Sequence, residues 1–173
     1  MNTSELITQF RNNHLELADY VNSLPNDQFL YSKNGKWTAG QQLSHVYLCL
    51  LPISKALTSK EFLIQKFGKI ERPLWDYNTV LANYKEALDK GGKAPEKFLP
   101  EAVQPETKAE LTSELHQILD SIQQQLGDYT EEELDTIVMP HPLLGIMTVR
   151  EMFFLMTYHA IHHLRQTEQN LKN

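Results

Sequence analysis

Three of the seven histidines in the chain fall within five positions near its C-terminal end, at His159, His162 and His163. The segment that carries them, residues 158–166, lies in an apolar run with the period of an α-helix. Residues four apart in a helix share one face, about one turn from each other, so the imidazoles of His159 and His163 would project side by side. Two imidazoles in this arrangement can bind one metal ion, which makes this segment the best candidate for chemistry.

A third ligand is expected from a different helix, because metal sites in helical bundles lie between facing helices. His45 meets this requirement, since it lies on the apolar face of an earlier predicted helix, where a polar group is costly to bury without a partner. His45, His159 and His163 would supply three neutral nitrogens and leave one or more coordination positions for water or substrate. Such open sites are typical of catalytic zinc, whereas structural zinc usually has four protein ligands.

His162 is an alternative to His163, because residues three apart in a helix also lie close together. We favour His163, since a spacing of four from His159 aligns it better with the apolar face that contains Met152 and Met156. His162 would then orient another group or simply pack beside the site.

Other residues are candidates for the pocket or for contacts with the ligands. Cys49 follows His45 by four residues and could be a fourth, soft ligand, although an unpaired cysteine is more often a small buried hydrophobe. His141 precedes the last predicted helix and could line the pocket mouth, but a solvated loop histidine is the more common case. Gln166 follows His162 by one turn and could lie at the cavity rim or hydrogen-bond a ligand nitrogen.

Four long helices are expected to position these residues, because apolar residues recur at spacings of three and four in four segments. The segments span residues 3–23, 38–58, 106–126 and 148–171. Capping-box patterns begin the second segment, from Thr38 to Gln41, and the fourth, from Thr148 to Glu151. Pro52 is expected to kink the second helix without ending its apolar face. We predict an all-α fold, a four-helix bundle.

The connections between the long helices are predicted to be mostly irregular. A short helix over residues 79–88 and a long loop over 91–105, with several prolines and glycines, are expected between the second and third long helices. A brief helical turn over residues 131–134 precedes residues 139–145, whose prolines and glycine indicate an ordered but irregular connection. No alternation of apolar and polar residues is long enough to predict a strand.

Length and composition narrow the class of protein. A chain of 173 residues is expected to form one domain, residues 1–173. Lysine and arginine number 16 against 22 acidic residues, and no basic cluster is present, so nucleic acid is not expected as a partner. Cys49 is the only cysteine, which excludes an internal disulfide and fits a reducing compartment. No signal-peptide pattern or long apolar run is seen, so we expect a cytoplasmic protein without a membrane partner.

Three motifs together resemble the DinB-like, or YfiT-like, superfamily. They are residues 37–46, residues 140–151, and the pattern His159-x-x-His162-His163-x-x-Gln166. The resemblance covers most of the chain and implies a four-helix bundle of up-down-down-up type. It also implies a divalent metal bound by one histidine of the second long helix and two of the fourth. Carried over position by position, these ligands are His45, His159 and His163.

The resemblance further implies a metal-dependent transferase that acts on small electrophiles with a low-molecular-weight thiol such as bacillithiol, mycothiol or glutathione. A divalent metal would lower the pKa of a bound thiol or water. A hydrolase is the first alternative, but the sequence shows no carboxylate beside the histidines to serve as its general base. A noncatalytic stress-response or binding protein with a structural or vestigial metal is the second. A di-iron carboxylate bundle is set aside, because the required Glu-x-x-His repeats are missing.

Three imidazoles and water constrain the metal only partly. Zinc is the favoured ion, and nickel, iron, manganese and cobalt also accept such ligands. The expected partners are a small-molecule substrate and a low-molecular-weight thiol. A homodimer is also common among bundles of this size.

Overall fold

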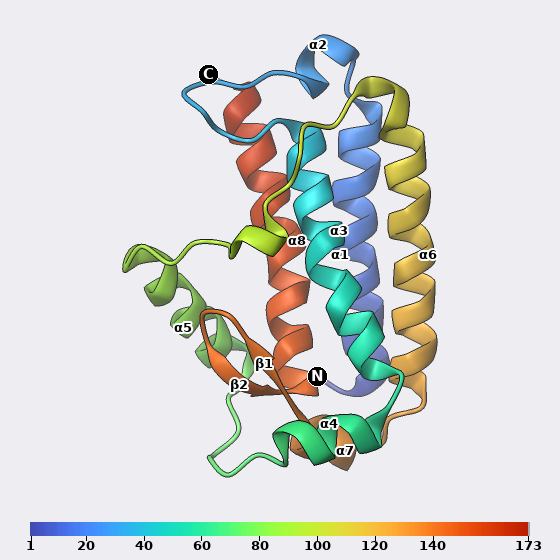
Figure 1. Ribbon diagram of the computed structural model, residues 1–173, viewed down its shortest axis with the longest axis vertical. Helices are drawn as coiled ribbons and strands as arrows, with labels where there is room; N and C mark the ends of the chain where they lie inside the picture. Colours follow the sequence, from blue (N-terminus) through green and yellow to red (C-terminus); the bar gives the residue numbers. More distant parts are fainter. Residues whose placement is uncertain (173) are drawn as a thin grey trace.

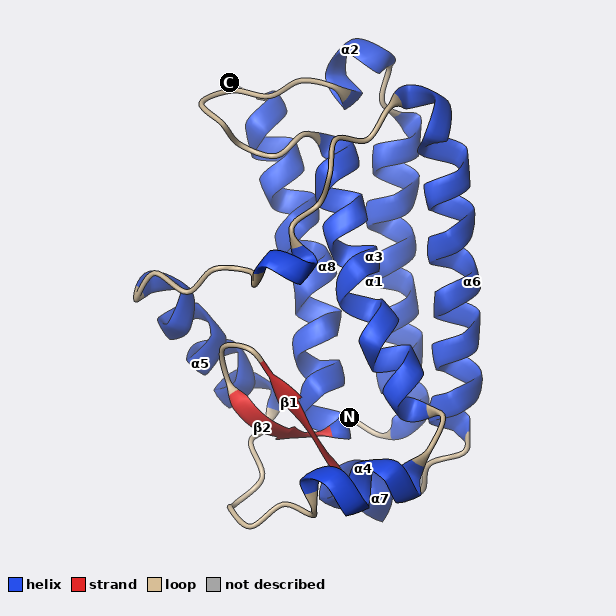
Figure 2. Ribbon diagram, in the orientation of Figure 1, coloured by secondary structure: helices blue, strands red, loops and turns tan. Residues whose placement is uncertain are grey.

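The computed structural model describes residues 1–172, and helices dominate them (Figure 1; Figure 2). The four longest helices lie side by side along the long axis of the molecule, with α1 and α8 running in one direction and α3 and α6 in the other. Each of α1 and α3 contacts both α6 and α8. The bounds of these helices are Thr3–Ser23 for α1, Ala39–Leu57 for α3, Lys108–Gly127 for α6 and Val149–Leu171 for α8. The prediction of a mostly helical fold is confirmed.

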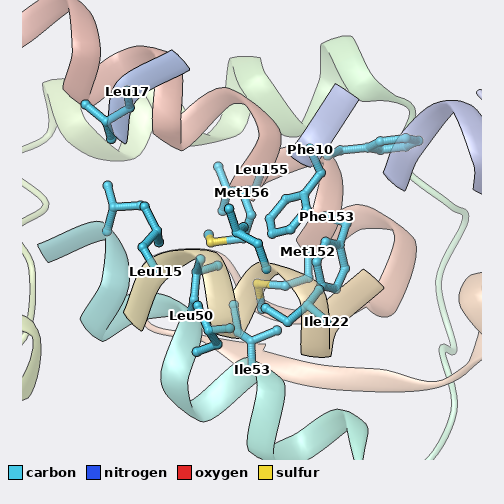
Figure 3. Packing of buried hydrophobic residues seen from close by; sticks show 14 of the residues in the cluster. Phe10, Leu17, Leu50, Ile53, Leu115, Ile122, Met152, Phe153, Leu155 and Met156 are labelled. Carbon is cyan, nitrogen blue, oxygen red and sulfur yellow. The ribbon is translucent and has the colours of Figure 1, made fainter. Parts of the chain in front are cut away.

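The core lies between the four long helices, and each of them contributes buried apolar side chains to it (Figure 3). Phe10 of α1 and Phe153 of α8 meet edge to face, with ring centroids 5.0 Å apart. Leu50 of α3 and Leu115 of α6 are fully buried in the same cluster. The helix periodicity of the sequence therefore identified the faces that pack together.

The starts of α3 and α8 are capped as the sequence predicts. The Thr38 hydroxyl accepts a hydrogen bond from the Gln41 N–H, and the Gln41 side chain accepts one from the Thr38 N–H. Thr148 and Glu151 make the same reciprocal pair at the start of α8. Pro52 lies inside α3, which continues to Leu57. Both helices that carry the candidate ligands thus have a fixed start and register.

The prediction of an irregular connection over residues 139–145 was wrong. Strands β1 (Val138–His141) and β2 (Gly145–Thr148) pair antiparallel, with Val138 opposite Thr148 and His141 opposite Gly145. Each strand has only four residues, which is too short for alternation to stand out, and β1 contains Pro140. Backbone pairing between segments decides this structure, and single-segment patterns do not report such pairing.

The connection between the second and third long helices contains more helix than expected. Instead of one short helix it holds α4 (Lys60–Phe67) and α5 (Tyr77–Asp89), and the predicted loop includes the 3₁₀ turn η1 (Glu96–Phe98). Helix α4 buries only Leu63, so its sequence carries little amphipathic signal. The short elements are completed by α2 (Asn26–Phe29), the 3₁₀ turn η2 (Pro105–Thr107) and α7 (Glu131–Thr136).

None of the helices in residues 1–172 combines the length and the apolar character needed to cross a lipid bilayer.

His14 gives the fold a pH dependence that can be measured. Its ring is fully buried in α1, Nδ1 lies 2.7 Å from the Phe10 carbonyl oxygen, and burial lowers the pKa of His14 to about 4. The unfolded chain takes up a proton at this residue near pH 6.5, whereas the folded chain does not, so stability falls as the pH drops from 7 to 5. We expect His14 to contribute about 2 kcal/mol of this loss.

Urea unfolding at pH 7 and pH 5, in the presence of a chelator, measures this contribution for the parent protein and for His14→Leu. The leucine variant should lose less stability than the parent over this pH interval. Equal losses in the two proteins would contradict the assignment.

Candidate metal centre

A cavity of about 810 Å³ lies between α3 and α8 and is covered by the connecting elements. His45 and Cys49 of α3 face it from one side, and His159 and His163 of α8 from the other. Its remaining wall comes from α4, α5, the 93–98 segment and the hairpin of β1 and β2. The predicted ligands of two helices are thus brought to one enclosed space, as the sequence analysis expected for a bundle.

His45 is held by the backbone of the covering segment. Its Nδ1 lies 2.7 Å from the carbonyl oxygen of Phe98, which can only accept, so Nδ1 carries the proton and donates it. Nε2 therefore has a free lone pair, and the Cys49 sulfur lies 3.6 Å from it. Burial lowers the pKa of His45 below its ordinary value, which favours the neutral ring that metal binding requires.

His163 is held in a similar way by a side chain of α3. Its Nδ1 makes a short hydrogen bond with the amide oxygen of Gln42, so the proton is again on Nδ1 and the lone pair on Nε2. This lone pair points at His159, because the two Nε2 atoms are 3.0 Å apart. Both rings are buried, and burial holds the pKa of each well below its ordinary value.

His159 is the member of the cluster without an anchor. Its Nδ1 is buried and has no hydrogen-bond partner among the described residues. In the metal-free protein its Nε2 can donate to Nε2 of His163, but no neighbour of Nδ1 fixes this tautomer. His159 can therefore turn a lone pair toward the site without breaking a bond on its other side.

The arrangement fits a metal ion held by imidazoles. Two nitrogens bound to one tetrahedral zinc ion lie about 3.3 Å apart, given Zn–N distances of about 2.0–2.1 Å. The 3.0 Å between Nε2 of His159 and Nε2 of His163 is close to this value. The rings of His45 and His163 have centroids 4.7 Å apart, and those of His45 and His159 5.2 Å apart. The three imidazole rings are therefore neighbours within one cluster.

The group of potential ligands that the structure brings within reach of one ion contains Cys49 and differs from the predicted set in that residue. One ligand atom from each of His45, Cys49 and His159 lies within 4.8 Å of the others. Burial raises the pKa of the Cys49 thiol to about 12, so without a metal ion it keeps its proton at neutral pH. His45 and His159 belong to both sets, and the sets differ in whether His163 or Cys49 completes them.

His162 and Gln166 lie at the edge of the cavity. The Gln166 side-chain amide donates to Nε2 of His162 over 2.9 Å, so that lone pair is already used. The His162 ring packs beside Tyr84 and Tyr158, with centroids 6.3 and 6.1 Å away. The structure therefore places His162 as a packed neighbour, and Gln166 bonds His162 rather than one of the three predicted ligands.

His141 lies in the cavity wall. The sequence analysis allowed this position but favoured a solvated loop histidine. Its Nδ1 accepts hydrogen bonds from the N–H groups of Leu143 and Leu144, both at 3.2 Å. Burial lowers the pKa of His141 to about 4. Its clearest role is to hold the turn between β1 and β2 in place against the cavity.

Sequence reasoning missed three contributors to the site. Gln42 was visible as a polar residue on a buried helix face, three residues before His45, and that position was the available signal. The Phe98 carbonyl left no signal in the sequence, because every residue has a backbone carbonyl group. Tyr84 of α5 is 6 % exposed and packs edge to face against His159, with centroids 6.4 Å apart, so it shields the cluster from solvent.

A buried carboxylate fastens the segment before α5 to the start of α8. Both oxygens of Glu151 accept from the guanidinium of Arg72, at 2.9 and 2.7 Å. Glu151 also accepts from the N–H groups of Trp75 and Thr148, at 2.7 and 2.9 Å. The three bonds from Arg72 and Trp75 tie the segment before α5 to α8, and α5 in turn carries Tyr84 to the histidines.

Comparison with models of known protein families gives a match over most of the chain. A family model described as the DinB superfamily matches residues 9–167. The matched range includes all of α3 and nearly all of α8, with every histidine of the cluster. A search of curated proteins found no match.

Proposed function

This chain belongs to the DinB superfamily, and from that membership we propose that it is a divalent-metal enzyme that transfers a low-molecular-weight thiol to a small electrophile. The observation that carries the proposal is the buried histidine cluster at the wall of a large cavity, with Nδ1 of two rings already hydrogen-bonded. We assign the fold to the up-down-down-up four-helix bundle of the family. Zinc is the favoured ion, and nickel, iron or manganese are alternatives.

His45, His159 and His163 would hold the metal in this proposal. The Phe98 carbonyl and the Gln42 amide keep protons on Nδ1 of His45 and His163, which presents Nε2 of both rings as lone-pair donors. A bound divalent metal would lower the pKa of a thiol or of a water molecule that it coordinates. Tyr84 and the apolar wall limit the access of bulk water to the histidines.

Thiol transfer is favoured over hydrolysis by the composition of the wall. Within the described residues, no aspartate or glutamate lines the cavity. A hydrolase usually needs a general base near its water, whereas a thiol that has lost its proton is already the nucleophile. The cavity volume of about 810 Å³ is within the range of small-molecule sites and leaves space for a second reactant.

A structural metal site is the second candidate, and the position of Cys49 favours it. If Cys49 joined the three histidines, four protein ligands would close the site in the manner of structural zinc. A closed site would leave no position for a thiol. The role of Cys49 therefore separates the catalytic proposal from the structural alternative.

Metal content of purified, untagged protein tests the ligand set after loading with zinc, nickel or ferrous iron. We expect about one metal ion per chain in the parent protein and in Cys49→Ala, and loss of metal in His163→Ala. Circular dichroism should show unchanged helicity in both variants. Loss of metal in Cys49→Ala with retention in His163→Ala would reject the three-histidine set.

Activity is tested on the metal-loaded protein with bacillithiol, mycothiol and glutathione as donors and chlorodinitrobenzene as a general electrophile. Conjugation above the uncatalysed rate in the parent, and its loss in His163→Ala, is the expected result. Full metal occupancy without acceleration for any of the three thiols would favour the structural alternative.

A further inference from the structure

The charged side chains that line the cavity all have the same sign. They are Lys66 of α4, Lys93 just before η1 and Lys97 within η1, and within the described residues no carboxylate joins them. All three lysines are exposed, so the positive charges of the lining remain accessible to solvent. From this lining we infer that the cavity takes an organic anion whose acidic group pairs with one or more of these lysines and whose apolar body fills the rest of the cavity.

The lysines are available to bind an anion. Among the described residues, none of the three forms an ion pair with an acidic side chain. Two of them lie over aromatic rings of the cavity wall instead. Lys66 Nζ is 5.2 and 5.4 Å from the ring centroids of Phe62 and Phe67, and Lys97 Nζ is 4.8 Å from that of Phe98. These contacts hold the side chains along the wall without neutralising their charge.

The sign of this cluster is opposite to that of the protein as a whole. The chain has a formal charge of −6, yet the wall carries three ammonium groups. Glu96 lies between Lys93 and Lys97 in the sequence, but it is exposed and does not line the cavity. Positive charges in the lining of a cavity on an acidic protein attract anions to that cavity in preference to the rest of the surface.

The interior of the cavity is suited to an apolar body. Besides the lysines and the histidines, the wall contains methionine, phenylalanine, leucine and isoleucine side chains. Met139, Met152 and Met156 contribute flexible thioethers, which adapt to ligands of different shape. A fully polar anion would leave this surface without a partner, so the apolar part of the ligand is as necessary to the inference as its charge.

This inference rests on the proposed function only for the direction of the ligand, whose reactive end would lie at the histidines. The charge and the apolar body follow from the wall alone. The two ideas therefore fail separately. If the protein binds metal but does not distinguish anionic from neutral ligands, the proposed function stands and this inference fails. If it prefers anionic ligands but binds no metal, this inference stands and the proposed function fails.

Two probes of similar shape test the inference. Anilinonaphthalene sulfonate carries an anionic group on an apolar body, and N-phenylnaphthylamine has the apolar body alone. Binding of each is followed by fluorescence with the parent, with Lys66→Gln/Lys93→Gln/Lys97→Gln, and with Lys55→Gln/Lys69→Gln/Lys172→Gln. The second variant is a matched control, because it loses the same charge from exposed lysines that do not line the cavity.

We expect the cavity variant to bind the sulfonate at least about tenfold more weakly than the parent, as follows from losing three partly exposed charge contacts. Its affinity for the neutral probe should be unchanged, and the control should match the parent with both probes. Added salt should weaken sulfonate binding to the parent more than to the cavity variant. Thermal unfolding and metal content are measured on the same samples, to show that the fold and the histidine cluster are intact.

Equal weakening by the two triple variants would overturn the inference, because it would show a nonspecific effect of net charge. Equal affinity of the parent for the two probes would also overturn it, since the lysines would then recognise nothing. Failure of the neutral probe to bind the parent would contradict the inference that the cavity binds the apolar part of the ligand.

Discussion

Replacing His159 with leucine is expected to abolish binding of divalent metal while leaving the metal-free protein at least as stable as the parent. His159 belongs both to the predicted set of three histidines and to the group of ligand atoms with Cys49 that the structure brings together, so its loss leaves neither set complete. Mutation of a residue that hydrogen-bonds a metal ligand typically lowers metal affinity by about 10–100-fold. Loss of a ligand itself should therefore lower the affinity by more than about 100-fold. The expected stability of the metal-free variant has a separate cause. Nδ1 of His159 is buried without a partner, and an apolar side chain removes that cost of about 1–3 kcal/mol, which offsets the loss of the hydrogen bond from Nε2 of His159 to Nε2 of His163.

Isothermal titration with zinc gives the affinity, and urea unfolding in the presence of a chelator gives the stability of the metal-free form. His14→Leu is the matched control, because it also replaces a buried histidine with an unpaired ring nitrogen, but outside the cavity wall. It should retain its metal. A His159→Leu protein that binds zinc like the parent would remove the histidine cluster as the metal site.

Replacing Glu151 with alanine is expected to destabilise the protein by about 2–4 kcal/mol, since it breaks a buried ion pair and leaves several donors without an acceptor. The Glu151 side chain is 2 % exposed and that of Arg72 28 % exposed, so water compensates the arginine only in part. Arg72 also lies over Trp75, with its guanidinium carbon 3.5 Å from the ring centroid, and this contact should loosen with the pair. Chemical denaturation at neutral pH measures the loss.

The matched control for this prediction is Glu86→Ala. Glu86 of α5 forms an exposed ion pair with Lys90, the residue that follows the helix, and such pairs contribute little to stability. A Glu151→Ala protein no less stable than this control would show that the segment before α5 is held by other contacts.

The Glu151 pair should also make stability depend on pH in the acidic range. Burial by itself raises the pKa of Glu151, but hydrogen bonds from Arg72 and from the N–H groups of Trp75 and Thr148 outweigh it and hold the pKa below its ordinary value. The contribution is therefore complete above the pKa of the unfolded chain, about 4.3 for glutamate, and is lost as the pH falls through the lower folded value. The parent and Glu151→Ala should converge in stability at low pH.

The sequence was sufficient for the parts of the site that lie on single helices. Capping boxes at Thr38 and Thr148 fixed the starts of α3 and α8, and the apolar spacing fixed their buried faces. The four-residue spacing then placed His159 and His163 side by side, because helix geometry depends only on residues near each other in the chain. His45 was found because a polar residue on a buried face needs a partner.

Other features depend on contacts between residues far apart in the chain. The Phe98 carbonyl that fixes the tautomer of His45 lies 53 residues away, in a segment predicted as loop. Gln42 and His163 are 121 residues apart. Neither pairing leaves a local pattern, because a hydrogen bond between two helices or a helix and a loop is decided by where the backbones pass each other.

The sequence by itself determined the four long helices, the buried face of each and a histidine from each of α3 and α8 for one site, because these follow from local periodicity and from the cost of burying polar groups. Only the tertiary structure decided which nitrogen is free in His45 and in His163, that Cys49 lies near His159 as well as His45, and that three lysines from two segments line one cavity. The physical reason is that lone-pair direction and local charge depend on neighbours brought together by packing, and those neighbours are not adjacent in the sequence.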